Sequence, residues 1–273
     1  MADLYLMGNA GSSQMFGAVI RTANKTVVID GGCKEDEKQL ETLLSELCGL
    51  QVDAWFFTHP HHDHVCAFCE LFQHNPNLQI GGIYHAFPQY AAFFAQENGM
   101  EDEFELSVWK EAETLLRERA KPCVHLLKKG DLLSFDDVTV KVLRVFHPEI
   151  THNFLNNSST VYRIETPETS ILILGDLGTE GGEELLADCP LADLQADYTQ
   201  MAHHGQHGVS KAFYDSIRPK RCIWAAPAWL WDNNAGNGFD TGPWETVRTR
   251  EWMEELGVKE HFVQKDGMRK IKI

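Results

Sequence analysis

The sequence predicts an α/β fold in which two mixed β-sheets stack face to face with helices on their outer faces, an αββα sandwich. Short apolar runs typical of strands alternate along the chain with segments whose apolar residues recur at helical spacing. The two halves repeat this order, strands first and helix–strand units afterwards, and no linker-like or low-complexity stretch separates them. With 273 residues, 43% of them hydrophobic, the chain can bury a large core, so we expect one domain over residues 1–273.

In the first half, the strand signal is a run of apolar and β-branched residues bounded by glycine or a polar turn. Val27–Ile29 is typical, because it ends in Asp30-Gly31-Gly32, a tight turn that glycine permits. The expected strands are 4–9, 12–22, 25–32, 52–58 and 78–86. The expected helices are 36–48, 65–74 and much of 88–120, with a break near residues 98–99.

The second half begins with strands in hairpins and continues with helix–strand units. The expected strands are those within 124–148, then 160–166, 170–178, 196–205, 221–227 and two short strands within 261–273. The expected helices are 182–189, 211–217 and 244–257. Residues 149–159 and 228–243 are rich in polar residues, and we expect them to be loops.

Residues 58–64 read THPHHDH and directly follow the predicted strand 52–58. Zinc accepts imidazole nitrogen and carboxylate oxygen as ligands, and a catalytic zinc keeps one position for water. His59 and His61 can converge on one ion from a tight turn, whereas Asp63 and His64 can face a second. We therefore predict that this loop supplies two ligands to each of two metal ions about 3.5–4 Å apart.

The remaining ligands are expected where other strands run out into loops. The candidates are Asp176 after ILILG, His203 and His204 after DYTQMA, and His147 and His152, which flank one loop. Taken singly, a histidine at a strand end is usually a polar surface residue, and Asp176 could cap a helix beginning near Thr179. Their combination with THPHHDH favours a metal site.

The three motifs around these candidate ligands resemble those of a known superfamily. THPHHDH, ILILGDLG and MAHHG, in this order, resemble the motifs of the metallo-β-lactamase-fold hydrolase superfamily, and the resemblance covers nearly the whole chain. Within it, the series NNSSTVYRIE, ILILGDLG and MAHHG is similar to the hydrolase domain attached to bacterial DNA-uptake (competence) membrane proteins. The chain differs from that domain at His61, where an aspartate is expected. The resemblance implies the αββα metallo-β-lactamase fold and a metal-dependent hydrolase.

Carried over residue by residue, the resemblance implies two metal sites bridged by Asp176. His59 and His61 would bind one ion with a third ligand from the 147–157 loop; we choose His152, with His147 and an asparagine of residues 153–157 as alternatives. Asp63 and His64 would bind the other ion with one histidine of the 203–204 pair; we choose His203 and keep His204 as the alternative. His62 is expected to bind no metal.

The expected cofactors are two divalent metal ions, zinc first, with Mn²⁺ or Fe²⁺ as alternatives. A hydroxide between them would attack an ester, phosphodiester, thioester or lactone. Asp63 would also orient the hydroxide, and His204 or His207 would protonate the leaving group. Asp30 and Thr58 are expected to hold the histidines in the required tautomers, with closure of its own turn as the alternative role of Asp30.

The composition of the chain indicates which kinds of substrate and partner are expected. The net charge of −16 and a pI near 5.2 repel phosphate backbones, so we expect a small-molecule substrate and no long nucleic acid. We expect no signal peptide and no membrane span, and seven scattered cysteines favour a reducing, cytoplasmic setting. A metal-binding module without turnover and a di-iron oxidoreductase are the alternative classes. The oligomeric state stays open.

Overall fold

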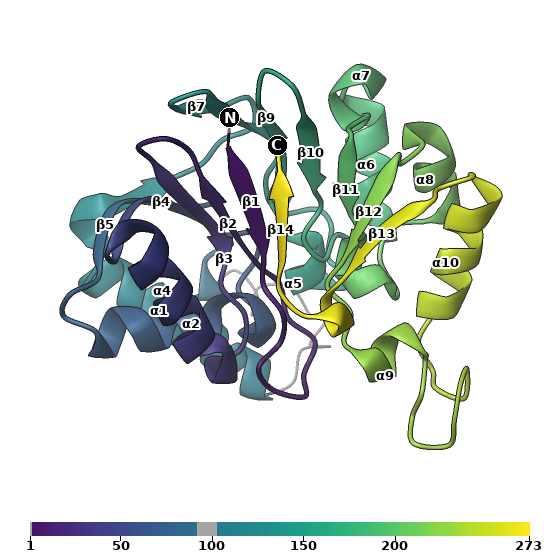
Figure 1. Cartoon of the computed structure of the whole chain (residues 1–273), viewed down its shortest axis with the longest axis horizontal. Coiled ribbons are helices and arrows are strands. Elements are labelled where there is room, and N and C mark those ends of the chain that lie inside the picture. Colours follow the sequence, from purple (N-terminus) through teal and green to yellow (C-terminus); the bar gives the residue numbers. More distant parts are fainter. Residues whose placement is uncertain (1, 92–102) are drawn as a thin grey trace.

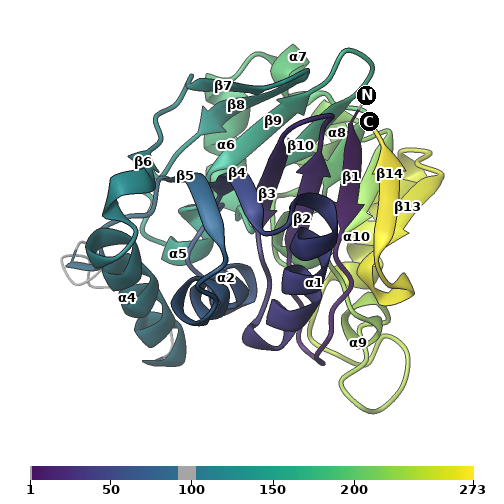
Figure 2. The ribbon, with the colours of Figure 1, turned by 60° about the vertical axis from the view of Figure 1, so that its left-hand side comes forward.

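In the computed structural model of the protein, which describes residues 2–91 and 103–273, two seven-stranded sheets stack face to face (Figure 1). The first sheet has the strand order β14-β1-β2-β3-β4-β5-β6, and the second has the order β13-β12-β11-β10-β9-β8-β7. Helices cover the outer side of each sheet, as the turned view in Figure 2 makes clear for α1, α2 and α4. The predicted αββα sandwich is therefore confirmed.

The elements have the following bounds. The first sheet contains β1 (Asp3–Leu6), β2 (Gly17–Arg21), β3 (Thr26–Asp30), β4 (Gln51–Phe56), β5 (Gln79–His85), β6 (Val124–Leu126) and β14 (Arg269–Lys272). The second contains β7 (Leu132–Phe135), β8 (Val138–Arg144), β9 (Val161–Glu165), β10 (Ser170–Ile173), β11 (Tyr198–Gln200), β12 (Arg221–Trp224) and β13 (Glu260–Val263). The main helices are α1 (Glu37–Cys48), α2 (His62–His74), α4 (Glu103–Glu118), α6 (Thr179–Asp188), α8 (Lys211–Ile217) and α10 (Thr246–Glu255), and shorter ones are α5 (Phe154–Asn157), α7 (Leu191–Leu194) and α9 (Ala228–Trp231).

The two sheets share one pairing pattern. From β14 to β3 the first sheet is antiparallel, and from β3 to β6 it is parallel. The second sheet is antiparallel from β7 to β10 and parallel from β10 to β13. The repeated order seen in the sequence is thus a repeated sheet topology.

Strand side chains alternate between two apolar layers. In β3, Val27 and Ile29 point into the core between the sheets, whereas Val28 packs under the helices of the first half. Every residue of β3 is buried, as expected for a strand that is covered on both faces. A third layer, which includes Leu185 and Met253, lies between the second sheet and its helices.

The chain ends meet at the edge of the first sheet. Strand β14 pairs antiparallel with β1, with Asp3 opposite Lys272. The backbone N–H of Ala2 donates to Ile273 O at 3.2 Å, and the N–H of Ile273 donates to Ala2 O at 3.0 Å. Figure 1 shows both termini at the same end of the molecule.

Several expected boundaries differ from the structure. Strand β11 stops at Gln200, three residues before His203, and the chain continues as a 3-10 turn over Ala202–Gly205. The second half of THPHHDH is not a loop, because α2 begins at His62. The expected loops 149–159 and 228–243 contain the short helices α5 and α9. The predicted break at residues 98–99 lies outside the described residues.

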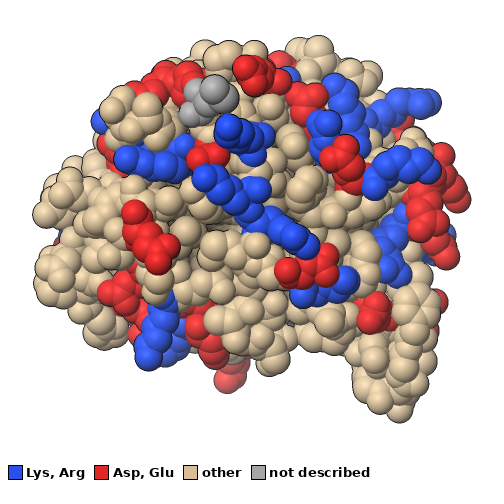
Figure 3. All heavy atoms as spheres, viewed as in Figure 1, with Lys and Arg blue, Asp and Glu red and all other residues tan. Residues whose placement is uncertain are grey.

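Charges on the face that carries β1 and β14 are mixed. Figure 3 shows Lys and Arg side chains forming a band there, with Asp and Glu side chains beside them. Lys270 of β14 lies 2.9 Å from Asp3, and Lys265 lies 2.7 Å from Asp266. Within the described ranges, no helix is long and apolar enough to cross a membrane.

Candidate metal centre

The first part of the site is the segment that leaves β4 and enters α2. His59 and His61 lie before the helix, and Asp63 and His64 lie in its first turn. All four side chains are buried, with at most 8% exposed. The carbonyl of His61 accepts backbone hydrogen bonds from His64 and Val65 at 3.1 Å, which fixes the turn into the helix. One short segment therefore presents four potential ligands at the carboxyl end of β4.

Asp176 reaches the same place from the second sheet. It follows β10 and Gly175, whose φ of +58° is the left-handed region that glycine favours. A Cβ at Gly175 would lie 2.8 Å from Ser159 Oγ and 2.9 Å from Thr58 Cβ, so no larger residue fits. The backbone N–H of Asp176 donates to Ser159 Oγ at 3.0 Å. The close approach of these loops places the Asp176 carboxylate against the histidines.

His204 completes the cluster from the turn after β11. His203 and His204 both have positive φ, 50° and 58°, a conformation that costs an ordinary residue on the order of 1–3 kcal/mol. This turn buries the His204 ring completely. It is anchored where the backbone N–H of His203 donates to Gly175 O at 3.0 Å.

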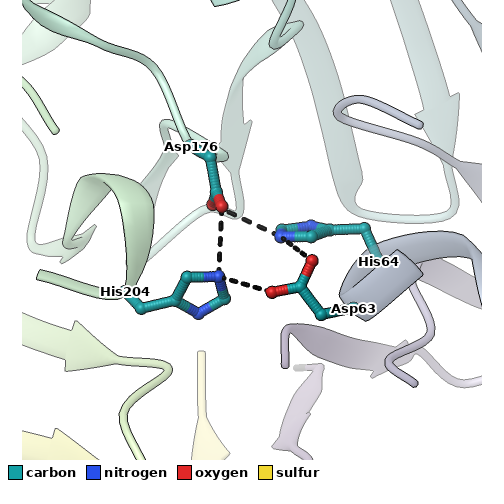
Figure 4. A group of neighbouring side chains, drawn as sticks. All are labelled: Asp63, His64, Asp176 and His204. Atoms are coloured by element: carbon teal, nitrogen blue, oxygen red, sulfur yellow. Dashed lines mark ion pairs between the residues drawn. The ribbon is translucent and has the colours of Figure 1, made fainter. Parts of the chain in front are cut away.

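The side chains converge in two groups of potential ligands. His204 Nε2 lies 3.0 Å from Asp63 Oδ2 and 3.1 Å from Asp176 Oδ2, and His64 Nε2 lies 3.3 Å from Asp176 Oδ1 (Figure 4). His59 Nε2 lies 3.8 Å from Asp176 Oδ2. One group comprises Asp63, His64, Asp176 and His204, the other comprises His59, His61 and Asp176, and the ligand atoms within each group lie within 4.8 Å of one another. Asp176 belongs to both.

The donor atoms fit divalent metal ions. His64 Nε2, His204 Nε2 and Asp176 Oδ1 are all buried without a hydrogen-bond partner of acceptable geometry, although they lie at ion-pair distances. A buried polar atom without a partner lowers the stability of the fold by about 1–3 kcal/mol. Three such atoms side by side therefore indicate a partner that binds all of them. A cation satisfies imidazole nitrogen and carboxylate oxygen together, and zinc is commonly bound by these atoms.

Hydrogen bonds on the far side of each ring hold the histidines in the ligand tautomer. His64 Nδ1 lies 2.8 Å from Asp30 Oδ2, and His204 Nδ1 lies 2.9 Å from Ala225 O. Because a carbonyl and a carboxylate only accept, each Nδ1 carries a proton, and each Nε2 faces the site, where a metal ion would take the place of its proton.

Thr58 extends this arrangement, since its hydroxyl donates to Asp30 Oδ2 at 2.7 Å and lies 3.1 Å from His59 Nδ1. Asp30 and Thr58 thus lie where they were expected to lie.

Electrostatics favour positive charge at the centre. Burial alone raises the pKa of Asp63 and Asp176, but His64 and His204 outweigh it and hold the pKa of both carboxyls well below the usual value. Burial lowers the pKa of His204, yet Asp176 and Asp63 raise it to about 9. A metal cation could replace these protons as the positive charge beside the buried carboxylates.

Three predicted residues are not brought into either group. His152, our choice for the third ligand beside His59 and His61, is 65% exposed and lies 2.8 Å from Glu180 Oε1. The alternative His147 is half-exposed, 3.8 Å from Glu184 Oε1. His207 is also exposed, 3.8 Å from Glu245 Oε2.

Within the 203–204 pair, the structure reverses our preference. His203 Nδ1 faces the carbonyl of His207 at 3.3 Å, whereas His204 enters the four-residue group. The reason is the left-handed turn, which interrupts the strand alternation on which a choice between neighbours would rest. His62 pairs with Glu105 of α4 and lies outside both groups.

The structure also shows two supporting residues: Arg144, which the sequence had not suggested, and Asn157, one of the asparagines kept above as an alternative ligand. Arg144 is buried in β8, and its guanidinium donates to the carbonyls of Asn157 and Ser159 at 2.7 and 3.1 Å. Asn157 Oδ1 accepts from the N–H groups of Gly178 and Gly181, both at 3.1 Å. These contacts fix the loops beside Asp176. The only sequence signal was a lone arginine within the apolar run VKVLRVF.

Two stacked sheets with a buried histidine–aspartate cluster where loops of both sheets meet define a class of αββα proteins with a candidate metal site. A family model described as the metallo-beta-lactamase superfamily matches residues 17–222, and the chain belongs to this superfamily. ComE operon protein 3 of Bacillus subtilis (strain 168) is 28% identical over 191 residues, which are 70% of this chain and 22% of that protein. The chain thus spans less than a quarter of the length of this relative.

Solved structures share the fold at low sequence identity. The metallo-beta-lactamase fold protein YhfI from Bacillus subtilis superposes with a TM-score of 0.58 at 11% identity, over 100% of both chains. A diphosphatase from the PhnP family superposes with a TM-score of 0.51 at 12% identity, over 100% of this chain and 98% of that one. The superfamily inferred from the three motifs is therefore confirmed.

Proposed function

We propose that the protein is a hydrolase that uses two divalent metal ions, zinc in the first place. The observation that carries this proposal is Asp176, a buried carboxylate shared by two ligand groups whose other members come from THPHHDH and His204. Ions bound there would supply a water of lowered pKa and would polarise the bond to be broken. A site of this kind suits hydrolysis of an ester, phosphodiester, thioester or lactone.

The protein residues have separate tasks in this proposal. Asp63, with Oδ2 3.0 Å from His204 Nε2, would orient the attacking water as well as bind metal. Because both ring nitrogens of His204 are directed to Ala225 O and to the carboxylates, His204 is a ligand and not the proton donor to the leaving group. His207 is exposed in the following loop and remains the proposed donor.

Phosphodiesters are the first substrate class to assay, because a fold neighbour described as a diphosphatase also acts at phosphorus. The chain's net charge of −16 favours a small substrate over a long polyanion, which overall repulsion would keep away. A small diester carries only one negative charge, and bound cations would offset it locally.

The proposal is tested by metal content and turnover measured on the same purified protein. In buffer that contains free Zn²⁺, we expect about two zinc ions per chain by elemental analysis and hydrolysis of bis-p-nitrophenyl phosphate. Asp63→Ala should abolish turnover, whereas His152→Ala, which removes an exposed histidine outside both groups, should keep wild-type turnover. Wild-type activity in Asp63→Ala would contradict the mechanism.

Other results point to the other classes. Two iron ions per chain would support the oxidoreductase. No bound metal and no turnover after addition of Zn²⁺ or Mn²⁺ would support a binding module.

A further inference from the structure

We infer that the two metal positions are unequal: the four-residue group retains its ion, and the three-residue group holds an exchangeable one. The four-residue group is Asp63, His64, Asp176 and His204, and the three-residue group is His59, His61 and Asp176. This inference rests on the proposed function, because it concerns the ions of that site. It concerns how this particular chain divides its ligands between them.

The first argument is the number of ligands. Four protein ligands complete the tetrahedral shell that zinc prefers, whereas three leave a position open. Among residues 2–91 and 103–273, no further histidine, cysteine or carboxylate places a donor atom in the three-residue group. The histidine we expected there, His152, is held outward by Glu180 of α6 at 2.8 Å.

The second argument is charge. Two carboxylates, Asp63 and Asp176, belong to the four-residue group, and a third, Asp30, lies directly behind it at 2.8 Å from His64 Nδ1. The three-residue group contains one carboxylate, Asp176, which it shares. A divalent cation in a buried site is stabilised by each nearby negative charge, so the four-residue group attracts it more strongly.

The third argument is the support behind the rings. His64 is fixed by a carboxylate and His204 by a backbone carbonyl, at 2.8 and 2.9 Å. His59 is supported by a neutral partner, the Thr58 hydroxyl, at 3.1 Å. Partners behind a ligand typically change metal affinity by about 10–100-fold, and a charged partner raises the basicity of the ring more than a hydroxyl does.

As a consequence, the ions of the two groups would have different roles in the reaction. The retained ion anchors the site permanently. The three-residue group would leave its ion a position that a substrate oxygen could fill. Occupancy of the second position would therefore depend on the free metal concentration in which the protein works.

The experiment is equilibrium dialysis of the full chain against chelator-buffered Zn²⁺ over a wide range of free concentration, with bound zinc counted by elemental analysis. For the wild type we expect two steps of one zinc each, separated by at least about tenfold in free Zn²⁺. A single step of two zinc ions would overturn the inference.

Variants then assign each step to its group. His59→Ala, or His61→Ala if the first fails to fold, should remove the second step and leave the first. His204→Ala should shift the first step to higher free Zn²⁺. His152→Ala is the matched control, and its curve should superimpose on that of the wild type. Loss of the second step in His152→Ala would also overturn the inference, because this histidine would then be the missing ligand.

Failure of the inference and failure of the proposed function give different results. A protein that binds two zinc ions in one step and hydrolyses bis-p-nitrophenyl phosphate keeps the proposed function and refutes the inequality. A protein that binds no zinc at any concentration refutes the proposed function itself.

Discussion

Replacement of His203 and of His204 by alanine separates metal binding from backbone effects, because the two residues are neighbours in the same turn. Their φ angles are 50° and 58°, so an alanine Cβ suffers the same left-handed strain at either position. Only His204 belongs to a ligand group. The two alanine variants therefore have a similar backbone strain, and only His204→Ala removes an imidazole that faces the metal position.

The expected magnitude follows from the contacts that His204 makes. Its Nε2 is one of four ligand atoms, and loss of a ligand should cost at least the 100-fold that the loss of a supporting partner can cost, or about 2.7 kcal/mol. His204→Ala also leaves the Ala225 carbonyl, now 2.9 Å from Nδ1, without this donor, which costs about 1–3 kcal/mol of stability. His203→Ala should change zinc affinity by less than about threefold, since a purely structural contact is lost.

The assay is zinc retention after dialysis, with thermal unfolding in excess chelator as the measure of stability that does not depend on metal. We expect His204→Ala to lose the tightly held zinc and His203→Ala to keep it. If His203→Ala lost the zinc and His204→Ala retained it, the choice between the two histidines would be refuted.

Three further predictions use matched residues or a defined pH range. Asp30→Asn should weaken zinc binding by about 10–100-fold, because Asp30 supports the ring of His64. Asp36→Asn, at another buried aspartate, should leave zinc binding unchanged. Equal zinc titrations of the two variants would contradict this prediction. Gly175→Ala should lower the free energy of unfolding in urea by more than about 2 kcal/mol, because its φ is positive and a Cβ would clash with neighbouring loops. Gly49→Ala should lower it by about 1 kcal/mol, because its φ is also positive but a Cβ would meet open space. Burial lowers the pKa of His85 from 6.5 to about 4, so the unfolded chain binds the proton more strongly than the folded chain. The free energy of unfolding should therefore fall by about 3 kcal/mol as the pH drops from 6.5 to 4. His85→Gln should flatten that part of the stability curve, and an unchanged slope would show that His85 is not its source.

The residues predicted best were those in sequence patterns that define their own geometry. His59, His61, Asp63 and His64 lie within six residues, so a strand followed by a helix is enough to bring them together. Asp176 follows an apolar strand so directly that the strand end locates it.

What could not be predicted depends on contacts between distant parts of the chain. His152 lies in the loop from which the resemblance implies a ligand, but its side chain is directed outward to Glu180 of α6, 28 residues further on. The choice of His204 depends on a left-handed turn that is held by Gly175, and neither histidine in MAHHG signals positive φ. Tertiary hydrogen bonds decide both positions, and the local sequence does not contain them.

The pairing of β14 with β1 has a consequence for how the chain folds during synthesis. Strand β14 leaves the ribosome after every other described strand, yet its partner is β1, so this contact spans almost the whole chain. Until it forms, β1 presents an open edge of the kind that recruits other nascent chains. The second sheet, β7 to β13, can assemble earlier. The sheet that is translated first is therefore completed last, and the slowest step in folding is expected to be this closure.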